Sequence, residues 1–302
     1  MKRSKLTTKQ TKLLQTVAVH RVLTAAQLSC LYGLSEEGAR RSLKKLRKLG
    51  CLQMLAGPMG ATSGRTPYVF ALNAAGIQIL RNSGFVERTV ADDRLGPVAP
   101  RMMAHQLLQN WCQISHARLI SGCDDLGGDF LPSTSPLLAG DEDGPWIAAQ
   151  ASVAGRVRHF VPDAVMGIAS QQQDKHLLFF LEIDMGSESA TSASSKANNL
   201  RAKILNYQAY QTSHGYRRYQ DEWGCQLHGF RVLFVAAHRQ GADRIRRLAQ
   251  QLPDTDFVWI THQDQMLDEG IGGNIWTHGT TPDPESILGP SLSKLLGHEG
   301  RL

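Results

Sequence analysis

Three carboxylates in the second half of the chain have a spacing that would place them on one surface. Asp163 follows Pro162 at the start of a predicted strand, and Glu182 and Asp184 lie at the end of the next one. The polar run 171–175 between the strands favours a tight turn. A hairpin centred on this run puts Asp163 opposite Glu182, with Cβ atoms about 4.5–5.5 Å apart, and Asp184 on the same face.

A patch of three carboxylates repels itself, so one group holds a proton or a cation lies among them. Carboxylate oxygens suit a hard divalent ion, and Mg2+ or Mn2+ held by Asp163 and Glu182 is the simplest solution. Such an ion would activate a water molecule and stabilise the charge that develops on a phosphodiester being cut. Glu188, just past the strand, would either join this cluster or cap the next helix. The alternative is a hairpin whose carboxylates meet only solvent.

The helix predicted near 192–212 carries basic and phenolic groups that would face these carboxylates. A stripe along this helix comprises Lys196, Leu200, Lys203, Tyr207 and Tyr210. Lys203 and Tyr207 would reach back over the carboxylates, with the Lys203 ammonium positioned for a phosphate or a developing oxyanion. Lysines that extend over a packed surface towards solvent, beside an ordinary buried tyrosine, are the structural alternative.

The first 85 residues have the pattern of three helices followed by a β-hairpin. Hydroxyl side chains stand at the start of each helical segment, as N-caps do. The predicted helices run from Thr8 to His20, from Thr24 to Leu31 and from Glu36 to Leu49, and the strands from Cys51 to Leu55 and from Tyr68 to Leu72. This order is typical of a winged helix-turn-helix, whose third helix enters the major groove of DNA.

Basic residues are concentrated in the same segment. Residues 1–100 contain 16 Lys and Arg against 5 Asp and Glu, whereas the rest of the chain has a negative balance. The residues predicted to contact double-stranded DNA, on the third helix and the hairpin tip, are Arg40, Arg41, Lys44, Lys45, Lys48 and Arg65. A three-helix protein-interaction module is the alternative.

The chain is long enough for two domains. The predicted parts are a winged-helix DNA-binding domain (1–85), a linker (86–101), an α/β domain (102–265) and a loosely ordered tail (266–302). The α/β domain begins with a helix from Met102 to Ile120. After an irregular stretch over 121–150, strands near 156–168 and 176–184 and later strands alternate with helices, which predicts layered α/β structure.

Composition excludes several classes of protein. A hydrophobic content of 42% with 20% charged residues is that of a globular chain. No apolar run is long enough to span a membrane, and the basic start lacks the apolar core of a signal peptide, so we expect a cytoplasmic protein without a membrane partner. Five scattered cysteines without a Cys-x-x-Cys pair indicate neither a disulfide framework nor a zinc site.

Together these motifs resemble the replication-relaxation family of bacterial mobile-element proteins. The resemblance rests on Pro162-Asp163, on the string Phe180-Leu-Glu-Ile-Asp-Met-Gly-Ser-Glu-Ser189 and on Lys203 with Tyr207, behind a basic winged helix. It extends from about Thr8 to Thr261. Because that family is similar to the PD-(D/E)XK nuclease superfamily, the resemblance implies an αβββαβ nuclease-like core with Met102 to Ile120 as its first helix. It places Asp163 and Glu182 at metal-ligand positions.

One position departs from the nuclease pattern. Active members of the wider superfamily carry lysine two residues after the glutamate, and this chain has Asp184 there. A carboxylate cannot stabilise an oxyanion as an ammonium does, so cleavage would require Lys203 or Lys196 to take that role. Tyr207 matches the tyrosine of a Gln-x-x-x-Tyr pattern found in some nucleases of this kind.

Three functions are open at this point. The first is a DNA-binding accessory protein for the replication, mobilisation or transcription of a plasmid or other mobile element. Its nuclease-like domain would be catalytically silent, and its partners would be a relaxase, a recombinase or a replication protein. The second is an active Mg2+- or Mn2+-dependent endodeoxyribonuclease delivered by the winged helix. The third is a winged-helix transcriptional repressor whose second domain binds a ligand or forms a homodimer.

Overall fold

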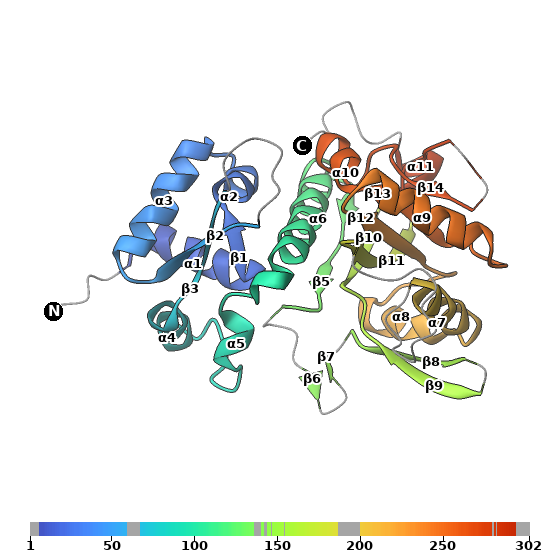
Figure 1. Ribbon diagram of the computed structural model, residues 1–302, viewed down its shortest axis with the longest axis horizontal. Coiled ribbons are helices and arrows are strands. Elements are labelled where there is room, and N and C mark those ends of the chain that lie inside the picture. The colour runs from blue at the N-terminus through green and yellow to red at the C-terminus, as the bar shows by residue number, and fades with distance from the viewer. Residues whose placement is uncertain are drawn as a thin grey trace. The chain divides into compact units, whose positions relative to one another are not determined.

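The computed structural model describes residues 6–58, 67–135, 140–141, 144–145, 147–153, 155–186, 200–279, 281 and 283–293. Two compact units divide the chain. Unit 1 consists of Met1–Ile114 with Thr134–Ala139, and unit 2 of Ser115–Ser133 with Gly140–Leu302. Both contain helices and strands, as labelled in Figure 1, so the expectation of a mixed α and β protein is confirmed.

Unit 1 contains the three helices and the hairpin that the sequence predicts, each ending within about one residue of its expected place. Its elements are α1 (Thr8–His20), β1 (Val22–Thr24), α2 (Ala25–Tyr32), α3 (Glu36–Lys48), β2 (Leu52–Ala56), β3 (Tyr68–Leu72), α4 (Ala74–Asn82), α5 (Asp92–Leu95) and the first part of α6 (Met103–Ser121). Side chains of Thr7, Thr24 and Ser35 cap the first three helices by accepting hydrogen bonds from backbone N–H groups.

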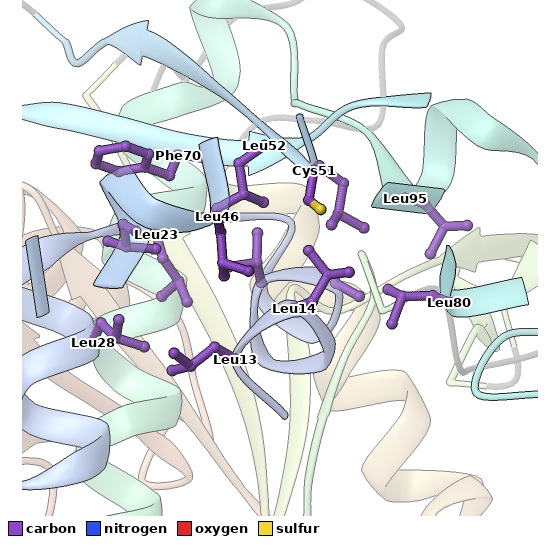
Figure 2. Packing of buried hydrophobic residues seen from close by; sticks show 14 of the residues in the cluster. Leu13, Leu14, Leu23, Leu28, Leu46, Cys51, Leu52, Phe70, Leu80 and Leu95 are labelled. Atoms are coloured by element: carbon purple, nitrogen blue, oxygen red, sulfur yellow. The ribbon is translucent and has the colours of Figure 1, made fainter. Parts of the chain in front are cut away.

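A three-stranded antiparallel sheet, in the order β1-β3-β2, forms the centre of unit 1. Side chains alternate along β3, so Phe70 points into the apolar cluster of α1, α2 and α3, part of which Figure 2 shows. Val69 points the other way, into a second cluster with Met103 and Leu107 of α6. The sheet is therefore covered on both faces.

Residues 86–101, which we expect to be a linker, are packed structure. Val86 and Leu95 are 3% and 0% exposed and belong to the core of unit 1. Arg81 of α4 forms an ion pair with Asp92 of α5 at 2.6 Å. The apolar residues here are too irregularly spaced to produce a helical pattern, although each is individually buried. The first unit consequently continues beyond residue 85.

Unit 2 is built on a seven-stranded mixed sheet. The strands of its main path lie in the order β14-β13-β12-β11-β10-β4, with β5 also paired to β10. The sheet strands are β4 (Leu126–Gly127), β5 (Phe130–Pro132), β10 (Ala164–Ser170), β11 (Lys175–Asp184), β12 (Arg231–Ala236), β13 (Val258–His262) and β14 (Thr277–His278). β11, β12 and β13 are parallel, and the other pairs are antiparallel.

Two small hairpins and five helices complete the described part of unit 2. The hairpins pair β6 (Gly140–Asp141) with β7 (Gly144–Pro145) and β8 (Ala149–Val153) with β9 (Arg156–Phe160). The helices, apart from the end of α6, are α7 (Leu200–Thr212), α8 (Arg218–Trp223), α9 (Arg239–Gln250), α10 (Gln263–Glu269) and α11 (Gly289–Ser293). No helix in the described ranges is long and apolar enough to cross a membrane.

Three expectations for unit 2 differ from the structure. The strand predicted over 156–168 is two strands, because β9 pairs with β8 and only β10 pairs with β11. The stretch 121–150, expected to be irregular, supplies β4 and β5 to the main sheet. The expected loose tail contains α10, β14 and α11, and its Trp276 is fully buried. Short elements with few apolar residues gave no detectable periodicity.

Candidate functional site

The β10–β11 hairpin has the register that the sequence predicts. Ala164 pairs with Leu181, which places Asp163 opposite Glu182 immediately before β10 begins. The Asp163 N–H donates to the Leu181 carbonyl at 3.0 Å, and a carboxylate oxygen of Asp163 accepts from the Ile183 N–H at 2.7 Å. Asp163 is therefore hydrogen-bonded to the backbone of the two residues that flank Glu182 in β11, and these bonds hold it close to Glu182.

Glu182 is 3% exposed and accepts hydrogen bonds from two side chains of α7. Lys203 Nζ lies 2.9 Å from Glu182 Oε2, and the Tyr207 hydroxyl lies 2.6 Å from Oε1. Residues four apart on a helix share a face, so both donors approach from the same side. Burial raises the pKa of Glu182, with a further contribution from nearby Asp163, while Lys203 and Tyr207 act in the opposite direction.

Tyr207 is fully buried and remains protonated. Burial, followed by the adjacent Glu182 carboxylate, holds the pKa of its hydroxyl well above 10. Its ring packs edge-on to Phe160 of β9, with ring centres 4.9 Å apart, and also contacts Phe180 of β11. A hydroxyl held in this way is a fixed hydrogen-bond donor to Glu182.

Asp184 is 2% exposed and pairs with a cation from a second helix. Arg244 of α9 lies 2.5 Å from Asp184 Oδ2, and the Gly186 N–H donates to Oδ1 at 2.9 Å. α9 approaches closely at Gly241, where a Cβ would lie 3.1 Å from that of Ala236. Sequence reasoning missed Arg244, 60 residues further along; the one available signal was that a helix following a parallel strand packs on the sheet.

The structure thus brings Asp163, Glu182, Lys203 and Tyr207 together and gives Asp184 a separate partner. Lys196 and Glu188 lie outside the described residues. Within the described ranges, His, Cys, Asp and Glu form no group of three or more able to hold a metal ion. Asp163 and Glu182 are oxygen donors of the type that Mg2+ or Mn2+ prefers, and their mutual repulsion would be relieved by a cation. Such an ion would compete with the Lys203 ammonium for Glu182.

α3 presents the other set of predicted residues. Ala39, Leu43 and Leu46 are buried on one side of this helix. The exposed basic residues predicted to bind DNA are Arg41, Lys44, Lys45 and Lys48. Their spacing of i, i+3, i+4 and i+7 forms one stripe opposite the buried side.

Arg40, although predicted to bind DNA, is engaged within its own helix. Its guanidinium lies 2.5 Å from Glu36 and 2.7 Å from Glu37. Arg65 lies outside the described residues. Arg47, which our prediction omitted, is exposed and donates to the sulfur of Met54 at 3.5 Å.

These features define a two-unit α and β protein with a basic helix in one unit and a buried acid–base cluster in the other. The chain belongs to the replication-relaxation family, whose model matches residues 14–224. The matched segment includes α3 and the Asp163–Glu182–Lys203–Tyr207 cluster, while Arg244 lies beyond it. Searches of curated proteins and of solved structures found no match.

Proposed function

We propose that this protein is a DNA-binding accessory factor in the replication or mobilisation of a plasmid or related mobile element. Unit 1 acts as a winged-helix domain, and α3 enters the major groove of duplex DNA. The observation that carries this proposal is the stripe of Arg41, Lys44, Lys45 and Lys48, which is exposed and makes no ion pair within the described residues.

The stripe suits phosphate better than it suits a protein partner. Three of its four members are lysines, which act as point charges towards phosphate and release counterions on binding DNA. Its only arginine, Arg41, has the planar fork that can read a guanine edge. The family assignment supports the biological setting, and a relaxase, a recombinase or a replication protein is the partner class that we propose for unit 2.

Titration of a labelled duplex, followed by fluorescence anisotropy at several salt concentrations, tests this function. Replacing Arg41, Lys44, Lys45 and Lys48 by alanine should reduce the magnitude of the slope of log K against log salt by about 2.7 if Arg41 reads a base, and by about 3.6 if it contacts a phosphate, since each phosphate contact contributes roughly 0.9. A variant with Arg88→Ala and Arg101→Ala, two exposed cations elsewhere in unit 1, is the control. An unchanged slope in the α3 variant would rule out α3 as the DNA-binding element.

A metal-dependent endonuclease is the second candidate, and one observation favours it. The Lys203 ammonium donates a hydrogen bond to Glu182. It would supply from α7 the positive charge that β11 lacks, since β11 has Asp184 at the expected lysine position. In this function Asp163 and Glu182 would hold Mg2+ or Mn2+, and the ion would supply an activated water molecule. Lys203 would then stabilise charge on the phosphate oxygens.

Nicking of supercoiled plasmid in Mn2+ and in Mg2+ tests the second candidate, together with Mn2+ titration by calorimetry. Asp163→Ala with Glu182→Ala is the inactive control, purified in the same way. Cutting by the native protein but not by the control variant would establish endonuclease activity. If the protein binds DNA but neither cuts it nor releases heat on Mn2+ titration, the accessory function remains. The carboxylate hairpin would then serve to dock a partner.

A further inference from the structure

A two-stranded ribbon, formed by β8 and β9, lies outside the main sheet of unit 2. Its strands pair with each other and with no other described strand. β8 packs on α7, as Figure 1 shows, with Ala149 and Ala151 buried. The ribbon is thus anchored on the helix that supplies Lys203 and Tyr207.

Two arginines on β9 project from one face of this ribbon. Arg158 is paired with Ala151, and Arg156 with Val153, so both arginines share the face of Ala149 and Ala151. Arg156 is exposed and Arg158 half-buried. Neither makes an ion pair or side-chain hydrogen bond within the described part of the chain, so their charge is uncompensated.

The local charge is opposite in sign to the surrounding half of the chain. Residues 101–302 contain 17 Lys and Arg against 22 Asp and Glu, but residues 149–160, which span the ribbon, include no acidic residue. An arginine pair that makes no ion pair within the described residues, in an otherwise acidic half of the chain, favours an anionic partner. The planar guanidinium suits phosphate oxygens, which it can contact with two N–H groups at once.

The arginines form a row that leads away from the acid–base cluster. The Phe160 ring lies 4.9 Å from that of Tyr207, which donates to Glu182. Alternate residues of a strand are about 6.6–6.8 Å apart, so Arg158 and then Arg156 follow Phe160 at this interval. Measured along the helix axis of duplex DNA, this interval equals the rise of about two phosphates of one strand.

We propose that the β8–β9 ribbon is a second DNA-binding element, in which Arg156 and Arg158 contact backbone phosphates of a duplex beside the Glu182 cluster. The proposal rests on the proposed function in one respect, namely that the ligand is duplex DNA. It adds a contact in unit 2 that does not depend on α3. The ribbon would hold DNA at the cluster whether that cluster cuts the duplex or only recognises it.

Salt-dependent binding of the full-length protein to a labelled duplex tests the ribbon. Arg156→Ala with Arg158→Ala should lower the magnitude of the slope of log K against log salt by about 1.8 and reduce affinity at moderate salt by roughly tenfold or more. The matched control is Arg239→Ala with Arg247→Ala, which removes two exposed arginines of α9. Arg156→Lys with Arg158→Lys keeps the charges and should retain most of the binding.

The outcomes separate the ribbon from α3. A reduced slope in the ribbon variant, with the α9 control unchanged, supports the proposal. If the ribbon variant loses binding while the α3 variant does not, the ribbon stands and the proposed role of α3 fails. An unchanged slope in the ribbon variant, or an equal loss in the α9 control, overturns the proposal. Unaltered circular dichroism in each variant, together with rescue by lysine, excludes misfolding as the cause.

Discussion

α3 of unit 1 and the end of β11 in unit 2 both concentrate charge, but they hold it in opposite ways. On α3, the side chains of Arg41, Lys44, Lys45 and Lys48 are exposed and make no ion pair within the described residues. At the end of β11, Glu182 and Asp184 are almost completely buried, and each is paired with a cation from a covering helix. Charge therefore serves a different purpose in each place.

This difference in burial means that the charges on α3 affect affinity for DNA, whereas the charges on β11 affect the stability of the fold. An exposed lysine contributes little to folding but remains available to a polyanion from solution. A buried carboxylate destabilises the fold when its partner is removed, so these ion pairs contribute to the stability of unit 2. We expect substitutions on α3 to change DNA binding, and substitutions around β11 to change unfolding.

The largest effect should follow from removing a partner of Glu182. Lys203→Met keeps the length of the side chain but leaves a buried carboxylate without its cation, which should reduce the free energy of unfolding by about 3 kcal/mol. Urea unfolding followed by tryptophan fluorescence reports this change, because four of the five tryptophans belong to unit 2.

Lys44→Met on α3 is the matched control for this measurement. It makes the same chemical change at an exposed position, so the free energy of unfolding should alter by less than about 0.5 kcal/mol. Equal losses in the two variants would contradict the distinction between the two regions.

A smaller effect should come from pH, through a buried histidine of unit 1. Burial lowers the pKa of His20 from 6.5 to about 4, so the folded protein keeps this ring neutral where the unfolded chain binds a proton. Stability should therefore fall as pH drops below 6.5, by about 2 kcal/mol at pH 5.

Hydrogen exchange of the α1 amides measures this pH dependence within unit 1. His20→Gln should remove most of the pH-dependent loss between pH 6.5 and 5, even if the variant is less stable at neutral pH. A native-like loss in that variant would assign the pH dependence to another group.

The smallest effect compares two ion pairs directly. A double-mutant cycle on Asp184 and Arg244 should give a coupling energy of about 1.5 kcal/mol, because Asp184 is buried. The same cycle on Glu36 and Arg40, which are 53% and 41% exposed, should give about 0.3–0.5 kcal/mol. Similar coupling energies would show that burial does not set the strength of these pairs.

Local patterns were sufficient for the first three helices of unit 1 and for the β10–β11 register. α3 begins at Glu36, where predicted, with Ser35 as its N-cap, and the polar turn at 171–175 determines which residues of the hairpin lie opposite one another. Lys203 and Tyr207 were found by helical spacing alone. These features depend on residues only a few positions apart, or on one short turn.

Features that depend on distant segments were not predictable. Val86 and Leu95 are buried because other elements of unit 1 surround them, and no periodicity reveals this. Arg244 reaches Asp184 only because β12 lies parallel to β11 and the chain then returns over the sheet as α9. Arg40 is a basic residue on the helix predicted to bind DNA, but its guanidinium forms ion pairs with Glu36 and Glu37 of the same helix.

The second apolar face of the unit 1 sheet has a consequence for synthesis of the protein. Val22 and Val69 are covered by Met103 and Leu107, which leave the ribosome long after β3. Until then the nascent sheet presents an uncovered apolar face, and folding of the N-terminal unit cannot be complete. A nascent chain whose first 85 residues have emerged from the ribosome should therefore be a substrate for chaperones, whereas one that has emerged as far as Ile114 should release them.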